Sequence, residues 1–212
     1  MNIMDKRAVN HLKRDRVMAG LIDKHGVLER ADDGKVDLFT NLAREIIGQQ
    51  LSGKVADVIW GRVVKLFEDL DDNLAKAQSH SQGLDPGTVL EVAEEKLRKC
   101  GVSYAKIKYI KNLAEAVLEN KVRLDEMESL SDEDVIREIT MVKGIGPWTA
   151  EMFLMFTLRR PDVFSLGDLG LRTAVGNLYG VERSDVKKIE EISLRWKPYR
   201  SAACRYLWKS LD

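Results

Sequence analysis

Apolar residues recur along most of this chain at the spacing of one face of an α-helix. Between residues 37 and 48 they stand three or four positions apart, and the same spacing returns between residues 103 and 118. Strict alternation of apolar and polar residues, which is typical of β-strands, is rare. The pattern therefore predicts an all-α protein.

Capping residues mark where the predicted helices begin. Asp37, Ser103 and Ser131 each stand directly before an apolar periodic run, as helix N-caps do. A capping box at its start predicts a further helix over residues 88–99. Residues 69–87 are polar and contain turn-forming residues, so we expect a connection there.

Length and composition narrow the class of protein. With 212 residues the chain suffices for one compact domain or two small lobes. Its 34 basic and 34 acidic residues balance, so a surface that binds nucleic acid has to be local. Cys100 and Cys204 are too far apart for a CxxC metal motif, and we expect two reduced, buried thiols. An apolar run of about 20 residues is missing from the sequence, so we expect neither a membrane nor a secreted protein.

The most informative stretch spans residues 131–172, where two predicted helices flank a tight hairpin. Gly144 and Gly146 are expected to supply positive φ angles, and Pro147 suits the first turn of the next helix. Bare backbone N–H groups and the helix dipole would make this hairpin an anion site. The apolar residues that follow, Phe156 among them, are expected to lie in the core.

Two polar features have plain structural interpretations when taken alone. The sequence GQQLS at residues 48–52 favours a polar turn between two helices. Lys106, Lys108 and Lys111 are expected to form a solvated helix face.

The last segment, residues 195–209, carries basic residues without an acid until Asp212. It indicates either a surface that faces DNA or bridges two lobes, or long basic side chains packed around Trp196 and Trp208. Both interpretations stay open at this point.

The run KGIGPWTAEMF, followed by DVF and GDLGLR, resembles the signature of helix–hairpin–helix DNA glycosylases, in particular the alkylpurine branch (3-methyladenine DNA glycosylase II). The resemblance implies an all-α, two-lobed helical fold with a DNA- and base-binding cleft between the lobes. An N-terminal segment, residues 1–36, would pack with C-terminal helices at 160–212. Residues 37–143 would form the central lobe, and residues 131–159 the helix–hairpin–helix motif.

The family's functional residues carry over to matching positions of this chain. Asp168 would be catalytic, because an ionised carboxylate stabilises the oxocarbenium character of deoxyribose as the glycosidic bond breaks. As the N-cap of the next helix it would be held ionised. The resemblance assigns Trp148, Trp208, Met152 and Leu169 to the base pocket; Gln50, Leu51 and Ser52 to the wedge, which fills the gap left by an extruded base; and Lys143, Gly144, Gly146, Thr149 and Arg172 to phosphate binding.

The substrate class follows from the lack of an obvious general acid among these residues. Purines alkylated at N3 or N7 are cationic and leave readily, and a cation suits an electron-rich aromatic pocket. The resemblance thus implies base-excision repair of 3-methyladenine, with 7-methylguanine also expected, in double-stranded DNA by base flipping. Met152 and Leu169 stand where some relatives have aromatic residues, which favours a narrower range.

Trp148 stands where strand-cutting relatives have a lysine that attacks the sugar. We therefore expect water as the nucleophile and a monofunctional enzyme that leaves an intact abasic site. Two alternatives are a glycosylase of this fold with another base specificity and a non-catalytic protein that binds DNA lesions.

The resemblance also implies a monovalent cation, Na⁺ or K⁺, on the main-chain carbonyls of Thr140, Val142 and Ile145, and no required cofactor. Two cysteines do not suffice for the four-cysteine iron–sulfur cluster of several related glycosylases. We expect a monomer that acts on DNA without membrane contact, in the cytoplasm with the nucleoid of a prokaryote or in the nucleus of a eukaryote.

Overall fold

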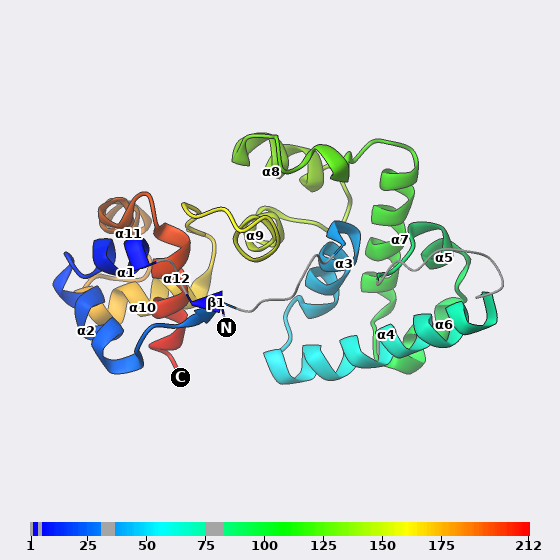
Figure 1. The fold of residues 1–212 in the computed structure, drawn as a ribbon, viewed down its shortest axis with the longest axis horizontal. Coiled ribbons are helices and arrows are strands. Elements are labelled where there is room, and N and C mark those ends of the chain that lie inside the picture. Colours follow the sequence, from blue (N-terminus) through cyan, green and yellow to red (C-terminus); the bar gives the residue numbers. More distant parts are fainter. Residues whose placement is uncertain (1, 4–5, 31–36, 75–82) are drawn as a thin grey trace. The chain divides into compact units, whose positions relative to one another are not determined.

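The computed structural model describes residues 2–3, 6–30, 37–74 and 83–212. The chain divides into two compact units (Figure 1). The central unit is Lys35–Phe153, and the terminal unit combines Met1–Gly34 with Leu154–Asp212.

The central unit is helical throughout its described residues. In chain order it contains α3 (Leu38–Gly48), α4 (Gly53–Leu74), α5 (Pro86–Glu91), α6 (Glu94–Cys100), α7 (Tyr104–Leu118), the short 3₁₀ helix η1 (Leu124–Glu126), α8 (Asp132–Thr140) and α9 (Pro147–Met152). The long helix α7 packs against α3, α5 and α6 (Figure 1). Its buried residues Ile107 and Leu113 meet an interior that also includes Leu42 and Ile46 of α3. The apolar stripes read from the sequence are thus the core of this unit.

The terminal unit is organised around its last helix. It contains the strands β1 (Asn2–Ile3) and β2 (Glu29–Arg30), the helices α1 (Lys6–Leu12), α2 (Arg16–His25), α10 (Leu169–Tyr179), α11 (Val186–Ser193) and α12 (Arg200–Lys209), and the 3₁₀ turn η3 (Leu194–Trp196). The π-helical turn η2 (Phe153–Thr157) continues α9 into it. Helix α12 packs against α1, α2 and α10, and its Tyr206 is fully buried.

The all-α prediction is confirmed. Within the described ranges the regular structure outside helices is the two-residue pair β1–β2, which is antiparallel with Asn2 opposite Arg30. None of the helices described is both long and apolar enough to cross a membrane.

The three predicted N-caps are confirmed as well. Asp37 accepts the N–H of Thr40 at 2.8 Å, and Ser103 accepts that of Lys106 at 3.4 Å. Ser131 accepts the N–H of Asp134 in α8 at 3.1 Å. Each bond satisfies one N–H that a helix start leaves without an intrahelical partner, and contributes about 1 kcal/mol.

The helix predicted over residues 88–99 was wrong. The chain there forms α5 and α6, with Val92 and Ala93 between them in extended backbone. Asp85 caps α5 by accepting the N–H of Thr88 at 2.8 Å. An Asp–Pro start is a stronger signal than the Thr88 capping box, because the aspartate caps and the proline pre-sets the first turn.

The connection predicted over residues 69–87 was also wrong at both ends, because α4 continues to Leu74 and α5 begins at Pro86. Residues 75–82 of that connection lie outside the described residues, as do residues 31–36 of the predicted N-terminal segment.

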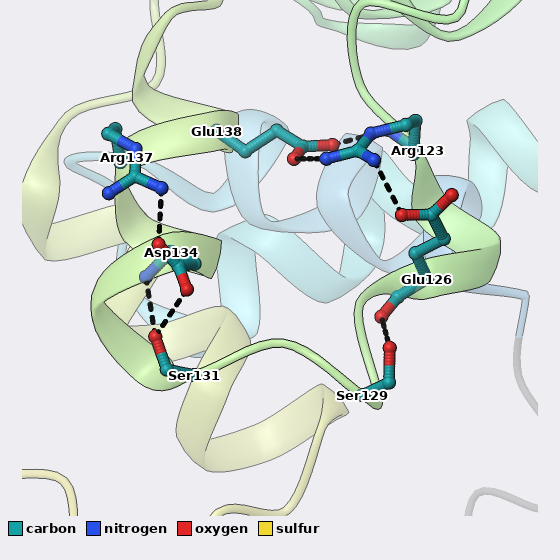
Figure 2. A network of polar contacts seen from close by, with 7 residues as sticks. All are labelled: Arg123, Glu126, Ser129, Ser131, Asp134, Arg137 and Glu138. Atoms are coloured by element: carbon teal, nitrogen blue, oxygen red, sulfur yellow. Dashed lines mark hydrogen bonds and ion pairs between the residues drawn. The ribbon is translucent and has the colours of Figure 1, made fainter.

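A polar network fixes α8, the first helix of the predicted hairpin motif (Figure 2). Buried Glu138 accepts the backbone N–H of Arg123 at 2.6 Å and its guanidinium at 2.9 Å. The same guanidinium binds Glu126 of η1 at 2.6 Å, and Asp134 pairs with Arg137 at the exposed start of α8. Removing Arg123 would leave a buried carboxylate uncompensated, so this network ties α8 to the chain before it.

Candidate functional site

The hairpin between α8 and α9, residues 141–146, rests on a tyrosine of α7. Gly144 has φ 108°, and a Cβ at this position would lie 2.0 Å from Cγ of Tyr109. Only glycine satisfies both the backbone angle and the space. Gly146 has φ −96° and open space where a Cβ would stand, so the positive φ predicted for it was wrong. Its bare backbone precedes Pro147, which occupies the first turn of α9 as predicted.

Side chains from α7 and α3 hold the carbonyl groups of the hairpin. Asn112 of α7 donates to the carbonyl of Lys143 at 3.2 Å. Gln49, the C-cap residue of α3, donates through Nε2 to Gly144 O and to Thr149 Oγ1, at 3.0 Å in each case. Thr149 is buried, so its hydroxyl is used inside the protein and its backbone N–H is the group left for the predicted phosphate contact.

The corner that follows α3, residues 49–52, presents the predicted wedge to solvent. Gln50 is exposed and has φ 58°. Leu51 is 37% exposed, and Ser52 is exposed too. Gln49 and Gln50 of the corner line a groove of about 700 Å³, together with the hairpin and one face of α7. The structure thus brings the predicted wedge and the predicted phosphate-binding hairpin together in the central unit.

The solvated face predicted for the lysines of α7 was wrong for two of the three. Lys106 is half-buried and donates to the carbonyls of Ile47 and Gln49 at 2.8 and 2.7 Å. Burial lowers the pKa of the Lys106 ammonium. Lys111 binds two carbonyls at the end of α5 in the same way, at 3.1 and 3.2 Å, whereas Lys108 is exposed. Both bound lysines complement helix C-termini, where carbonyls lack intrahelical partners.

Asp168 lies in the terminal unit, at the N-cap of α10, as predicted. Its Oδ1 accepts the backbone N–H of Leu171 at 2.7 Å and the indole N–H of Trp208 at 3.1 Å. Two donors on one carboxylate oxygen stabilise its negative charge. Gly170 makes room for this arrangement, because a Cβ there would lie 3.1 Å from Asp168 Oδ1 and 3.3 Å from Cδ1 of Trp208.

An aromatic pair adjoins this carboxylate through Trp208. The ring of Trp208 is half-buried and packs on Phe156 with centroids 5.9 Å apart. Phe156 is 47% exposed, so its prediction as a core residue was wrong. It projects from the π-helical turn η2, whose wider turn shifts the 3.6-residue phase on which that prediction rested. Leu169, beside Asp168 in the chain, is 57% exposed.

The remaining predicted residues fall in both units. In the central unit, Trp148 is half-buried and lines the groove, Lys143 is exposed and Met152 is buried. In the terminal unit, Arg172 is half-buried on α10, and its buried Nε has no hydrogen-bond partner among the described residues. The predicted base pocket and cleft draw on residues of both units and stay predictions.

Part of the basic C-terminal segment is neutralised by acids of its own unit. Arg200 binds the Asp162 carboxylate through Nε at 2.8 Å, and Lys209 binds that of Asp212 at 2.9 Å. Trp196 is fully buried. For Arg200 the structure thus favours packing, whereas Lys209 lies on the surface in an exposed ion pair.

The carbonyls of Thr140, Val142 and Ile145 belong to the end of α8 and the hairpin that follows. Carbonyl oxygens of this kind suit Na⁺ or K⁺. Val142 O also accepts the N–H of Ile145 at 3.0 Å, which leaves its second lone pair for an ion. Across the described residues, no cluster of three or more His, Cys, Asp or Glu side chains could hold a metal. Cys100 and Cys204 are buried and form no disulfide, as predicted.

Known proteins resemble this chain over most of its length. A curated Bacillus subtilis relative is 32% identical over 176 residues, which are 82% of this chain but 59% of the relative. The chain therefore spans less than two thirds of that protein. The crystal structure of a DNA-3-methyladenine glycosidase from Bacillus halodurans is 35% identical, with a TM-score of 0.77 and coverage of 99% of this chain and 92% of that one. The solved structure of a Schizosaccharomyces pombe 3-methyladenine DNA glycosylase in complex with abasic DNA is 30% identical, with a TM-score of 0.78 and 96% of each chain covered.

The family model described as HhH-GPD superfamily base excision DNA repair protein matches residues 43–198. This range contains the corner, the hairpin and Asp168. The chain belongs to the HhH-GPD superfamily of base excision DNA repair proteins.

Proposed function

We propose that this protein is a DNA glycosylase that hydrolyses the N-glycosidic bond of alkylated purines in double-stranded DNA. The observation that carries the proposal is the Asp168 carboxylate, whose Oδ1 accepts N–H groups from Leu171 and Trp208. Two relatives that align along nearly their whole length support it, since their names include 3-methyladenine glycosidase or glycosylase. We expect 3-methyladenine as the preferred base and 7-methylguanine as a poorer one.

The carboxylate would act on the sugar rather than on the base. Positive charge develops on deoxyribose as the bond breaks, and an anion beside C1′ stabilises it. Asp168, with two N–H donors on Oδ1, suits this role and can orient the attacking water, but it is a poor proton donor. The base therefore has to leave without a proton from this group, which favours purines already made cationic by alkylation.

Trp208 and Phe156 would recognise such a base. A cation over an aromatic face gains about 0.5–2 kcal/mol, whereas a neutral purine gains less. The 47% exposure of Phe156 leaves its ring open to a ligand. A base within the duplex stack is out of reach of any side chain, so the target nucleotide would have to flip out.

The hairpin would hold the DNA backbone without reading sequence. Gly146 leaves the start of α9 bare, and no side chain caps that start, so a phosphate can approach its backbone N–H groups. Exposed Lys143 would add a cation beside it. A Na⁺ or K⁺ ion on the carbonyls of Thr140, Val142 and Ile145 would add further positive charge.

We also infer that the DNA strand is left uncut. A strand-cutting relative would need a lysine at the position of Trp148, and an indole forms no Schiff base. Incubation with methylated DNA in the presence of sodium borohydride tests this directly. We expect no covalent protein–DNA adduct, and a trapped adduct would contradict a monofunctional mechanism.

The base range can be measured by incubating the protein with methylated genomic DNA and separating the freed bases by chromatography. We expect 3-methyladenine to appear first and 7-methylguanine more slowly. Release of neutral oxidised purines in place of methylated ones would favour a glycosylase of another specificity. Release of no base at all would favour a protein that only binds lesions.

A further inference from the structure

We propose that Gln49 and Lys106 are positioning residues that fix the corner, residues 49–52, to the hairpin. The predicted wedge and the predicted phosphate-binding hairpin would then act on DNA as one rigid body. This inference deepens the proposed function, and it rests on that function only in taking the corner as the wedge. Its evidence is a closed set of hydrogen bonds within the central unit.

Gln49 makes the direct link between the corner and the hairpin. Both hydrogens of its Nε2 are used, one on Gly144 O and one on Thr149 Oγ1, at 3.0 Å each. These partners lie 95 and 100 residues further along the chain. Thr149 is 2% exposed, so its end of the link is shielded from competing water. The next residue in the chain, Gln50, is the first residue of the predicted wedge.

Lys106 holds the other side of the corner. Its ammonium donates at 2.8 Å to the carbonyl of Ile47, in the last turn of α3, and at 2.7 Å to that of Gln49, the C-cap residue. Gln49 is thus bound at both ends, by its own amide and by its carbonyl. Its φ of −49° and ψ of 130° turn the chain out of the helix at this point.

Helix α7 carries both sets of contacts on one face. Lys106, Tyr109 and Asn112 recur at three-residue spacing and are therefore neighbours on the helix surface. Lys106 binds the corner, Tyr109 lies under Gly144, and Asn112 binds the carbonyl of Lys143. The corner, the hairpin and α7 close a ring of contacts, with Gln49 as the link between the first two.

This ring has a consequence for the wedge. Gln50 has φ 58°, a conformation that a residue with a side chain keeps only when its surroundings enforce it. The fixed carbonyl and amide of Gln49 supply that constraint immediately before it. Without them the corner can relax, and the wedge has to be ordered again on each encounter with DNA.

The test uses a duplex with a tetrahydrofuran abasic site and 2-aminopurine opposite it, so that an inserted wedge changes the fluorescence. The probe has no base to release, so it reads wedge insertion even if the protein released no base from methylated DNA. We expect Gln49→Leu and Lys106→Met to keep less than about a third of the wild-type signal at saturation, with affinity reduced only about two- to fivefold. Lys106→Arg, which keeps a cationic donor, should restore most of the signal.

Matched variants separate positioning from general damage. Lys108→Met, an exposed lysine on the same helix, should leave signal and affinity unchanged. A double variant, Gln50→Ala with Leu51→Ala, gives the fluorescence signal of a protein without a wedge. Adding Gln49→Leu to this double variant should reduce the fluorescence signal no further. Full signal in Gln49→Leu, equal losses in Lys108→Met, or a wild-type signal no larger than that of the double variant would each overturn the proposal.

Discussion

The indole N–H of Trp208 donates to Oδ1 of Asp168 at 3.1 Å, although the two residues are 40 positions apart in the chain. The same indole packs on Phe156. One residue therefore contacts both the carboxylate proposed to act on the sugar and the ring proposed to face the base. This coupling makes the proposed functional residues of the terminal unit testable by small substitutions.

Trp208→Phe should impair base release while leaving the fold intact. The variant keeps an aromatic ring but removes the donor to Asp168. A hydrogen bond to a charged group contributes about 1.5–3 kcal/mol, so we expect single-turnover release from methylated DNA to fall about ten- to a hundredfold. Phe156→Leu is the complementary control, because it keeps the donor and removes the second ring. A wild-type rate for Trp208→Phe would show that the bond has no role in the reaction.

Gly170→Ala should separate activity from stability. The added methyl group would lie 3.1 Å from Asp168 Oδ1 and 3.3 Å from Trp208, so it pushes the indole away from the carboxylate. Alanine is the better helix former by about 1 kcal/mol, which offsets the crowding. We expect slower base release with an unchanged or slightly higher Tm. Normal release would mean that the site tolerates movement of the indole.

The two hairpin glycines should respond differently to alanine. Gly144→Ala places a methyl group on the Tyr109 ring and strains a φ of 108°, so we expect a loss of about 3 kcal/mol or more in urea unfolding. Gly146→Ala meets open space at φ −96° and should fold normally. It should nevertheless weaken binding to abasic DNA, because the methyl group stands where a phosphate would approach. Equal binding by Gly146→Ala and the wild type would contradict the proposal that the hairpin backbone binds a DNA phosphate.

We expect Glu45 of α3 to make the stability of the protein depend on pH, independently of catalysis. Burial raises the pKa of its carboxyl group above 4.5, and neighbouring Arg44 offsets part of this effect. The folded state then binds more protons than the unfolded state from about pH 4.5 up to the raised pKa, so stability falls as pH rises through that window. Glu45→Gln should have a higher Tm than the wild type at about pH 8, and the difference should vanish below about pH 4.5. Glu68→Gln, an exposed position on α4, is the control and should show no such difference.

Local signals in the sequence were sufficient for several helix starts and for the N-cap position of Asp168. Ser131, Ser103 and Asp168 cap the helices they precede, because a cap depends on residues only a few positions away. The tight turn at Gly144 was found for the same reason. Gly146 looked equivalent in the sequence but differs in the structure, since only Gly144 lies against Tyr109.

Contacts between distant segments could not be read in this way. The hydrogen-bond partners of Gln49 are about a hundred residues away. Lys106 binds carbonyls 57 and 59 residues before it, so the helical spacing of the sequence shows Lys106 only as a polar position. Phe156 was misplaced because η2 changes the period itself. A signal was available in the sequence for the face of α7 that contacts the corner and the hairpin. It is the three-residue spacing of Lys106, Tyr109 and Asn112.

The most direct test of the proposed function compares Asp168→Asn with the wild type on methylated DNA and, in parallel, on a duplex with a tetrahydrofuran abasic site. The amide keeps the size of the side chain but not its charge. We predict that the variant binds the abasic duplex within about threefold of the wild type and releases 3-methyladenine at least about a hundredfold more slowly. Base release by Asp168→Asn at a rate near that of the wild type would contradict the role of the carboxylate.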